Sequence, residues 1–202
     1  MNENVTAIVL AGGKGKRLGQ AKATLKLGER TIIEDVVDEM AGLASEVIVV
    51  TSTSQNDLPH NLQTQVYTDI YPGKSALGGV YTGLVKSSNQ YNLVVACDMP
   101  FLNLNLLQHM ISLAADVDIV TIKVGQNVEP LHAVYSKACI EHIENMFEKD
   151  DLQVSHLLDG VKVRYIDENE LDEYDPHHLS FFNINNKSDL ARAKKLKETE
   201  AK

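Results

Sequence analysis

Residues 5–22 decide the fold and read Val5-Thr6-Ala7-Ile8-Val9-Leu10-Ala11-Gly12-Gly13-Lys14-Gly15-Lys16-Arg17-Leu18-Gly19-Gln20-Ala21-Lys22. The apolar run over residues 5–10 predicts a buried parallel strand. The segment after it holds four glycines and four cationic side chains. Glycine lets backbone N–H groups approach phosphate oxygens, and Lys and Arg add positive charge there. A strand that enters such a loop predicts a nucleotide site, although a solvated turn could have the same composition.

The glycine-rich segment matches neither of the two common phosphate-binding motifs. A P-loop requires G-x-x-x-x-G-K-[ST], whereas Gly13 is followed by Gly19-Gln20. A dinucleotide-binding fingerprint requires a third glycine where this chain has Leu18. The remaining pattern is L-A-G-G-x-x-x-R-[LM]-G followed by Lys22. It resembles the signature loop of nucleotidyltransferases, which move a nucleoside monophosphate from an NTP to a phosphate or sugar phosphate.

The composition is that of one acidic domain. The chain has 202 residues, a hydrophobic fraction of 44% and a formal net charge of −9. The length predicts a single domain, and the charge argues against non-specific binding to nucleic acid or to an anionic membrane. Cys97 and Cys139 fit no metal or redox spacing, which predicts two reduced thiols. No apolar stretch has the length of a signal peptide or membrane span, so we expect a cytoplasmic protein.

Apolar runs alternate with helical patterns along the chain. Strands are predicted at residues 5–10, 47–50, 65–67, 92–97 and 118–124. Helices are predicted after Thr31, which has Glu34 in capping-box position, over residues 76–85, after Asn103, and from residue 187 with a frayed tail at 196–202. The acidic stretch 167–175 is predicted to be a loop. This order predicts one α/β domain, residues 1–202, with three α/β/α layers and a mostly parallel, Rossmann-like sheet.

Two aspartates are predicted at the carboxyl ends of strands, where ligands bind in such sheets. Asp98 ends the strand at 92–97 and is followed by Met99-Pro100. It is either a suitable oxygen ligand for Mg²⁺ that bridges NTP phosphates, or a helix cap or Asx turn. Asp69 precedes a glycine-containing segment that reaches Gly78-Gly79. It either accepts a hydrogen bond from a nucleotide base or forms a turn.

Two further polar clusters lie in the second half of the chain. Glu129-Pro130-Leu131 predicts a rigid corner before a strand. Asn183 and Asn185 alternate with apolar residues over 181–186, which predicts a strand with both amides on one face. The two amides offer donors and acceptors to a ligand, or they form the hydrated face of an edge strand.

The order of these pieces resembles the molybdenum cofactor guanylyltransferase family over about residues 5–195. The matching pieces are Leu10–Gly13 with Arg17 and Lys22, Asp69 with Leu77-Gly78-Gly79, Cys97–Pro100, Glu129–Leu131 and Phe182–Asn185. The resemblance implies a fold of the nucleotide-diphospho-sugar transferase type, with a nucleotide-binding half at 5–125 and an acceptor-binding half at 126–195. It implies transfer of GMP from GTP to the phosphate of molybdenum-loaded molybdopterin, with Mg²⁺ as cofactor and pyrophosphate as leaving group.

The resemblance also implies roles for single residues. Arg17 and Lys22 would offset negative charge at the α-phosphate and on the leaving pyrophosphate, and Asp98 would hold Mg²⁺. The residues implied for the nucleotide are Leu10, Ala11, Gly12, Gly13, Lys22, Asp69, Gly78 and Asp98. Those implied for the acceptor are Glu129, Asn183 and Asn185. The implied protein partners, which the sequence does not identify, are one that delivers molybdopterin and a molybdoenzyme that receives the product.

Three positions depart from the family pattern. Ala21 stands where an aspartate is usual, Lys74–Gly79 replaces a Gly-Pro-Leu-Ala-Gly segment, and His132 replaces an apolar or aromatic residue. These departures leave other activities open. The chain could instead be a cytidylyltransferase, a guanylyltransferase for another phosphate such as adenosylcobinamide phosphate or phospholactate, or a sugar-1-phosphate nucleotidylyltransferase. It could also be a non-catalytic nucleotide-binding protein.

Overall fold

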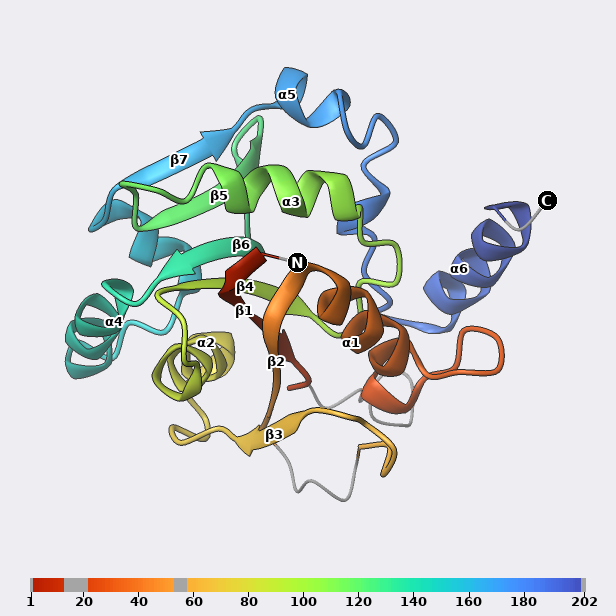
Figure 1. The fold of residues 1–202 in the computed structure, drawn as a ribbon, viewed down its shortest axis with the longest axis horizontal. Helices are drawn as coiled ribbons and strands as arrows, with labels where there is room; N and C mark the ends of the chain where they lie inside the picture. The colour runs from red at the N-terminus through yellow and green to blue at the C-terminus, as the bar shows by residue number, and fades with distance from the viewer. Residues whose placement is uncertain (1, 13–21, 53–57, 201–202) are drawn as a thin grey trace.

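One seven-stranded sheet forms the centre of the computed structural model, which describes residues 2–12, 22–52 and 58–200 (Figure 1). The strands lie in the order β3-β2-β1-β4-β6-β5-β7. Their bounds are β1 (Asn2–Leu10), β2 (Ala44–Thr51), β3 (Gln65–Thr68), β4 (Tyr91–Ala96), β5 (Ile119–Val124), β6 (Asn127–Ser136) and β7 (Val163–Ile166). The five strands predicted from apolar runs are all present.

Most neighbouring strands are parallel. β1 pairs in parallel with β2 and β4, β2 with β3, and β5 with β7. β6 runs antiparallel to both of its neighbours, β4 and β5. The mostly parallel sheet predicted from the alternating pattern is therefore confirmed, and β6 is its one reversed strand among the described residues.

Helices cover both faces of the sheet, as Figure 1 shows. The α-helices are α1 (Ile32–Leu43), α2 (Ser75–Lys86), α3 (Leu104–Ser112), α4 (Cys139–Glu148), α5 (Glu168–Asp172) and α6 (Lys187–Glu200). The 3-10 helices are η1 (Lys22–Thr24), η3 (Val154–Asp159) and η4 (Leu179–Phe181). One core cluster contains buried residues of α1, α3, α5 and α6, and the other contains those of α2, α4 and η3. The three predicted layers are confirmed.

The central strand β1 shows why its sequence is apolar throughout. Successive side chains of a strand point to opposite faces, and both faces of this sheet are covered. Ala7 and Val9 therefore pack in one cluster while Ile8 and Leu10 pack in the other. The same division places Cys97 and Cys139 in different clusters, on opposite faces of the sheet.

Local signals start the helices where the sequence predicts them. Thr31 and Glu34 form the capping box of α1, with the Glu34 Oε2 accepting from the Thr31 N–H at 2.7 Å. These hydrogen bonds lower the pKa of Glu34 to about 2. Asn103 caps α3 by accepting a hydrogen bond from the Leu106 N–H at 3.0 Å. Each cap satisfies an N–H group that the first helical turn leaves unpaired.

Three local predictions are wrong. Residues 182–185 form no strand and run as an irregular segment between η4 and α6. The predicted corner at Glu129-Pro130 lies inside β6, where the pairing with β5 shifts register. Such a bulge tolerates a proline because the ladder hydrogen bonds are already interrupted there. The acidic stretch predicted as a loop contains the short helix α5, capped by Asp167.

The carboxyl-terminal helix packs on the amino-terminal half. α6 continues to Glu200, through part of the tail predicted to fray. Its Lys197 donates to the Leu27 carbonyl at 3.2 Å and pairs with Asp35 of α1 at 2.8 Å. Among the described residues, no helix combines the length and the apolar character needed to cross a membrane.

Candidate functional site

The register of the parallel strands brings distant residues to one edge of the sheet. Leu10 at the end of β1 lies beside Val50 of β2 and Ala96 of β4. The chain remains paired just beyond these ends, because the Ala11 N–H donates to the Val50 carbonyl at 2.8 Å and the Cys97 N–H to the Leu10 carbonyl at 3.1 Å. Gly12, Ser52 and Asp98, which follow the ends of β1, β2 and β4, therefore lie close together at the carboxyl edge of the sheet.

Asp69 joins them from the next strand. Thr68 of β3 is in register with Thr51 of β2, and the Asp69 N–H donates to the Thr51 carbonyl at 2.8 Å. Asp69 and Asp98 thus lie at the carboxyl edge of the sheet, as the sequence predicts for strand ends in a parallel sheet.

Three polar side chains meet at this edge from remote parts of the chain. The Lys22 Nζ lies 2.5 Å from the Asp98 Oδ2 and 2.7 Å from the Asn185 Oδ1. Lys22 begins η1, Asp98 follows β4, and Asn185 precedes α6. The side chains of Lys22 and Asp98 are only 20% and 12% exposed. This partial burial strengthens their attraction relative to an ion pair in water.

A backbone contact holds the carboxyl-terminal segment in the same place. The Ile184 N–H donates to the Asp98 carbonyl at 3.0 Å, and Ile184 is fully buried. Asn183 and Asn185, on either side of this anchor, are therefore held near Asp98 without the strand that the sequence predicts. The Asn183 Nδ2 donates to the Phe181 carbonyl at 3.0 Å.

A cavity of about 810 Å³ opens at this cluster. Its size is within the range of small-molecule sites. Its lining includes Leu10, Gly12, Lys22, Val50, Ser52, Asp69, Gly73, Ser75, Ala76, Gly79, Ala96, Asp98, Met99, Glu129, Pro130, Leu131 and Asn183. Seven of the predicted site residues are in this list, namely Leu10, Gly12, Lys22, Asp69, Asp98, Glu129 and Asn183.

The other predicted site residues are placed differently. Ala11 is nearly buried beside the cavity, and Asn185 reaches it through its bond to Lys22. Gly78 is packed behind Asp69. Gly13 and Arg17 lie outside the described residues.

Asp69 has local bonds that match the predicted turn. Its Oδ1 accepts from the Tyr71 N–H at 2.9 Å and from the Thr82 Oγ1 at 3.0 Å. A Cβ on Gly78 would lie 2.8 Å from the Asp69 Oδ2, so only glycine fits there without movement. Asp69 therefore forms the predicted turn, and it also lines the cavity.

Glu129 belongs to the bulged part of β6. Its carbonyl accepts from the Thr121 Oγ1 at 3.0 Å, and the neighbouring Pro130 carbonyl accepts from the Tyr135 hydroxyl at 2.6 Å. These bonds hold the bulge and direct it toward the cavity. Burial raises the pKa of the Glu129 carboxyl. A nearby cation would favour its charged form.

The site suits a hard cation that is bound chiefly by its substrate. Within residues 2–12, 22–52 and 58–200, no group of three or more His, Cys, Asp and Glu side chains could hold a metal. Mg²⁺ at nucleotide sites commonly uses only one or two carboxylates together with phosphate oxygens and water. The Asp98 and Asn185 oxygens already converge on one cation, the Lys22 ammonium. The donor set therefore fits Mg²⁺ that is shared with phosphates.

Sequence reasoning missed several lining residues. Ser52 follows β2 as Asp98 follows β4, so the strand-end rule could have identified it. Ser75 and Met99 carry no comparable signal. His132, which departs from the family pattern, is fully buried in β6, and neither ring nitrogen has a partner among the described residues. Burial lowers the pKa of His132 to about 4, with a weaker opposing effect from Asp175.

Comparisons with known proteins agree on one group of relatives. The family profile described as the MobA-like NTP transferase domain matches residues 7–163. A probable molybdenum cofactor guanylyltransferase of Pelotomaculum thermopropionicum is 34% identical, over 96% of this chain and 93% of the relative. A molybdenum cofactor guanylyltransferase of Desulfosudis oleivorans is also 34% identical, over 94% of each chain.

A solved structure extends the likeness to the fold. The crystal structure of molybdopterin-guanine dinucleotide biosynthesis protein A from Archaeoglobus fulgidus superposes with a TM-score of 0.84 and 25% sequence identity. The superposition covers 96% of this chain and 99% of that one. The likeness therefore extends over nearly the whole of both chains.

Proposed function

The chain belongs to the MobA-like NTP transferase family as a nucleotidyltransferase of the molybdenum cofactor guanylyltransferase type, and on this premise we propose that it transfers GMP from GTP to molybdenum-loaded molybdopterin. In this reaction an oxygen of the molybdopterin phosphate attacks the α-phosphorus of GTP. The bond from that phosphorus to the β-phosphate oxygen breaks, and pyrophosphate leaves. The single observation that carries the proposal is the convergence of Lys22, Asp98 and Asn185 at one cavity.

Charge stabilisation is the main requirement of this reaction. Phosphoryl-type transfer depends on in-line positioning and on groups that neutralise spread negative charge. The Lys22 ammonium supplies positive charge at the cavity, and Arg17 is proposed to add more. Asp98 is the residue proposed to hold Mg²⁺, which would polarise the phosphate oxygens and neutralise the leaving pyrophosphate.

The cavity wall supplies positions for both substrates. We propose that Gly12, with Leu10, Ala11 and Gly13, admits the nucleotide at the end of β1. Asp69 and Gly78 belong to the same proposed nucleotide site.

The acceptor would lie in the same cavity, against the wall opposite the nucleotide. Glu129, Asn183 and Asn185 are proposed to face it. Residues 5–125 and 126–195 would then be the nucleotide-binding and acceptor-binding halves of one domain, in a cytoplasmic enzyme. Proteins that deliver molybdopterin and receive the product are proposed as its partners.

The first experiment measures pyrophosphate release with GTP, CTP, ATP or UTP, in the presence of Mg²⁺ and molybdenum-loaded molybdopterin. We expect release with GTP alone. Release with CTP instead would assign a cytidylyltransferase, and no release with any of the four would contradict this acceptor or catalysis itself.

Variants then test the residue roles. Asp98→Ala should abolish Mg²⁺-dependent release, and Lys22→Ala should reduce kcat by about 10²–10³, the scale of removing one charge-stabilising group. Lys162→Ala is the matched control, because Lys162 is an exposed residue just before β7 whose hydrogen bonds to the Asp118 carboxylate and to the Asp118 and Ile119 N–H groups are all made by its backbone. Full activity in Asp98→Ala would refute the metal role.

A further inference from the structure

Two loops from different halves of the chain are tied together beside the cavity. The Ser75 hydroxyl donates to the Leu152 carbonyl at 2.8 Å, and the Lys74 Nζ pairs with the Asp150 Oδ1 at 2.8 Å. Ser75 begins α2, whereas residues 150 and 152 lie between α4 and η3. We call residues 71–75 and 147–152, with the contacts between them, the clamp.

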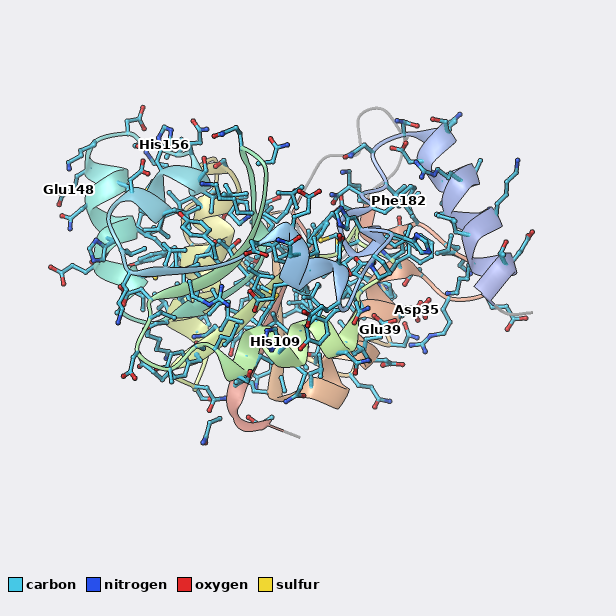
Figure 2. All side chains as sticks on the ribbon, turned by 90° about the horizontal axis from the view of Figure 1, so that it is seen from above. Asp35, Glu39, His109, Glu148, His156 and Phe182 are labelled. Atoms are coloured by element: carbon cyan, nitrogen blue, oxygen red, sulfur yellow. The ribbon has the colours of Figure 1, made fainter. Side chains whose placement is uncertain are left out.

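A cluster of three aromatic rings completes the clamp. The Tyr71 ring centroid lies 4.9 Å from that of Phe147 and 5.2 Å from that of Tyr81, and the Tyr81 and Phe147 centroids are 5.5 Å apart. The Tyr81 hydroxyl also donates to the Glu144 Oε1 at 2.6 Å. α4 therefore packs directly on the loop that leads into α2. Figure 2 shows Glu148 of α4 and His156 on one side of the molecule and Phe182 on the other.

The clamp contains two residues with left-handed backbone. Ser75 has φ 55° and Asp150 has φ 53°, in the left-handed region that favours glycine. Residues other than glycine remain in such conformations only when surrounding contacts hold them there, and such residues cluster at functional sites. Here the two left-handed residues stand in contacting loops. Ser75 makes its hydroxyl bond to the second loop. Asp150 follows the carboxyl end of α4, where its N–H donates to the Phe147 carbonyl at 3.1 Å and the Asp151 N–H donates to the Met146 carbonyl at 3.0 Å, so its left-handed backbone closes that helix.

One of the two loops of the clamp lines the cavity, and the other supports it from outside the cavity. Gly73, Ser75 and Ala76 line the cavity, next to Asp69 and Gly79. Among the described residues, Phe147, Asp150 and Leu152 do not line the cavity, so they act on it only through the clamp. The Ser75 hydroxyl donates its hydrogen to the Leu152 carbonyl, and its oxygen still has lone pairs that can accept a hydrogen bond.

We propose that the clamp positions the 73–79 wall of the cavity and thereby determines which nucleotide base is accepted. This inference rests on the proposed function, because it concerns the nucleotide of that reaction. It also addresses the segment in which this chain has Lys74 and Ser75 instead of the family's Gly-Pro-Leu-Ala-Gly. Discrimination between bases requires polar backbone groups at fixed positions, since a wall that can shift would pair with the wrong base as well.

The contacts of the clamp differ in how strongly they hold the cavity wall. The Asp150 side chain is 83% exposed, so its ion pair with Lys74 is largely screened by water. The Ser75 hydroxyl bond and the packing of Phe147 on Tyr71 should therefore carry most of the positioning. Ser75 lines the cavity itself, so Ser75→Ala alone would not separate positioning from direct contact. Phe147 and Asp150 make that separation possible.

The experiment compares wild type with Phe147→Leu, Asp150→Gly, the double variant and Ser75→Ala. Leu keeps an apolar side chain at 147, and Gly keeps the left-handed backbone at 150. For the double variant we expect KM for GTP to rise about fivefold or more and the GTP-to-ATP ratio of equilibrium binding affinities to fall by a similar factor. The kcat with GTP should stay within about twofold. Ser112→Ala is the matched control, because its hydroxyl donates to the His109 carbonyl at the end of α3, and it should change neither value.

A second readout does not depend on turnover. Amide hydrogen exchange over residues 73–79 should accelerate in Ser75→Ala and in the double variant, because each loses one of the two contacts that carry most of the positioning. Unchanged KM and base ratio in the double variant, or unchanged exchange in both, would overturn the proposal. If wild type released no pyrophosphate with any nucleotide, the proposed function would fail instead. Equilibrium binding of GTP and ATP to the same variants would then test the clamp, and unchanged relative affinity would overturn it.

Discussion

Replacing His132 by leucine should remove a pH-dependent weakness from the protein. The imidazole is 0% exposed, and burial holds its pKa at about 4, below the ordinary value of 6.5. At pH values between 4 and 6.5, His132 is protonated in the unfolded chain but stays neutral in the folded chain. The free energy of unfolding is therefore unaffected by this group above pH 6.5, and it falls as the pH drops toward 4.

The size of the effect follows from the difference in pKa. Each pKa unit corresponds to about 1.4 kcal/mol, so lowering the pH from about 7.5 to about 4.5 should cost roughly 2.5 kcal/mol through His132. His132→Leu removes this cost because leucine does not titrate. It also removes two buried nitrogens without partners, whose desolvation costs about 1–3 kcal/mol. The substitution also loses the edge-to-face contact between the His132 and Phe181 rings, whose centroids are 5.2 Å apart. That loss should cost about 0.5–1.5 kcal/mol and so offsets part of the gain.

The assay is urea unfolding followed by circular dichroism at several pH values between about 4.5 and 7.5. Near pH 7.5 the variant should equal or exceed wild type by up to about 2 kcal/mol, and its advantage should grow by roughly 2.5 kcal/mol near pH 4.5. His60→Gln controls for the loss of a histidine, because His60 is exposed. Parallel stability curves for wild type and His132→Leu would refute the reasoning.

Two further predictions concern packing and charge. A Cβ at Gly83 of α2 would lie 2.5 Å from the Ile8 Cγ2, so Gly83→Ala should destabilise the protein by about 1–3 kcal/mol in urea unfolding. Gly42→Ala in α1, where nothing lies within 4 Å, should stabilise it by about 0.5–1 kcal/mol, and equal effects would contradict the packing argument. Burial, with a contribution from neighbouring Asp35, raises the pKa of Glu39 to about 7 (Figure 2 labels both residues). Wild-type stability from this group is lost as the pH rises from 4.5 through 7, so Glu39→Gln should raise Tm more at pH 8 than at pH 4.5, and an equal change at both would speak against it.

Local patterns in the sequence predicted much of the fold. The apolar run at residues 5–10 identified β1, and the Thr31–Glu34 pair identified the start of α1. These signals involve residues within one strand or one helical turn, so they can be interpreted without knowing how the rest of the chain folds. The strand-end rule likewise placed Asp69 and Asp98 at the edge that carries the cavity, because it needs only the direction of parallel strands.

Where the sequence prediction failed, a distant contact overrode the local pattern. Asn183 and Asn185 alternate with apolar residues as in a strand, yet the backbone bond from Ile184 to Asp98 holds that segment at the site. The reversal of β6 and the bulge at Pro130 depend on the strands beside them.

The sequence by itself determined the β-α order, the helix starts and the residue types available at strand ends. Only the tertiary structure decided that Lys22 would meet Asp98, 76 positions along the chain, and Asn185, 163 positions along. It also decided that the Ser75 hydroxyl would be committed to a loop after α4. The physical reason is that periodicity and capping are set by neighbours within a few residues. Burial and pairing of remote polar groups are instead set by how all the layers pack at once.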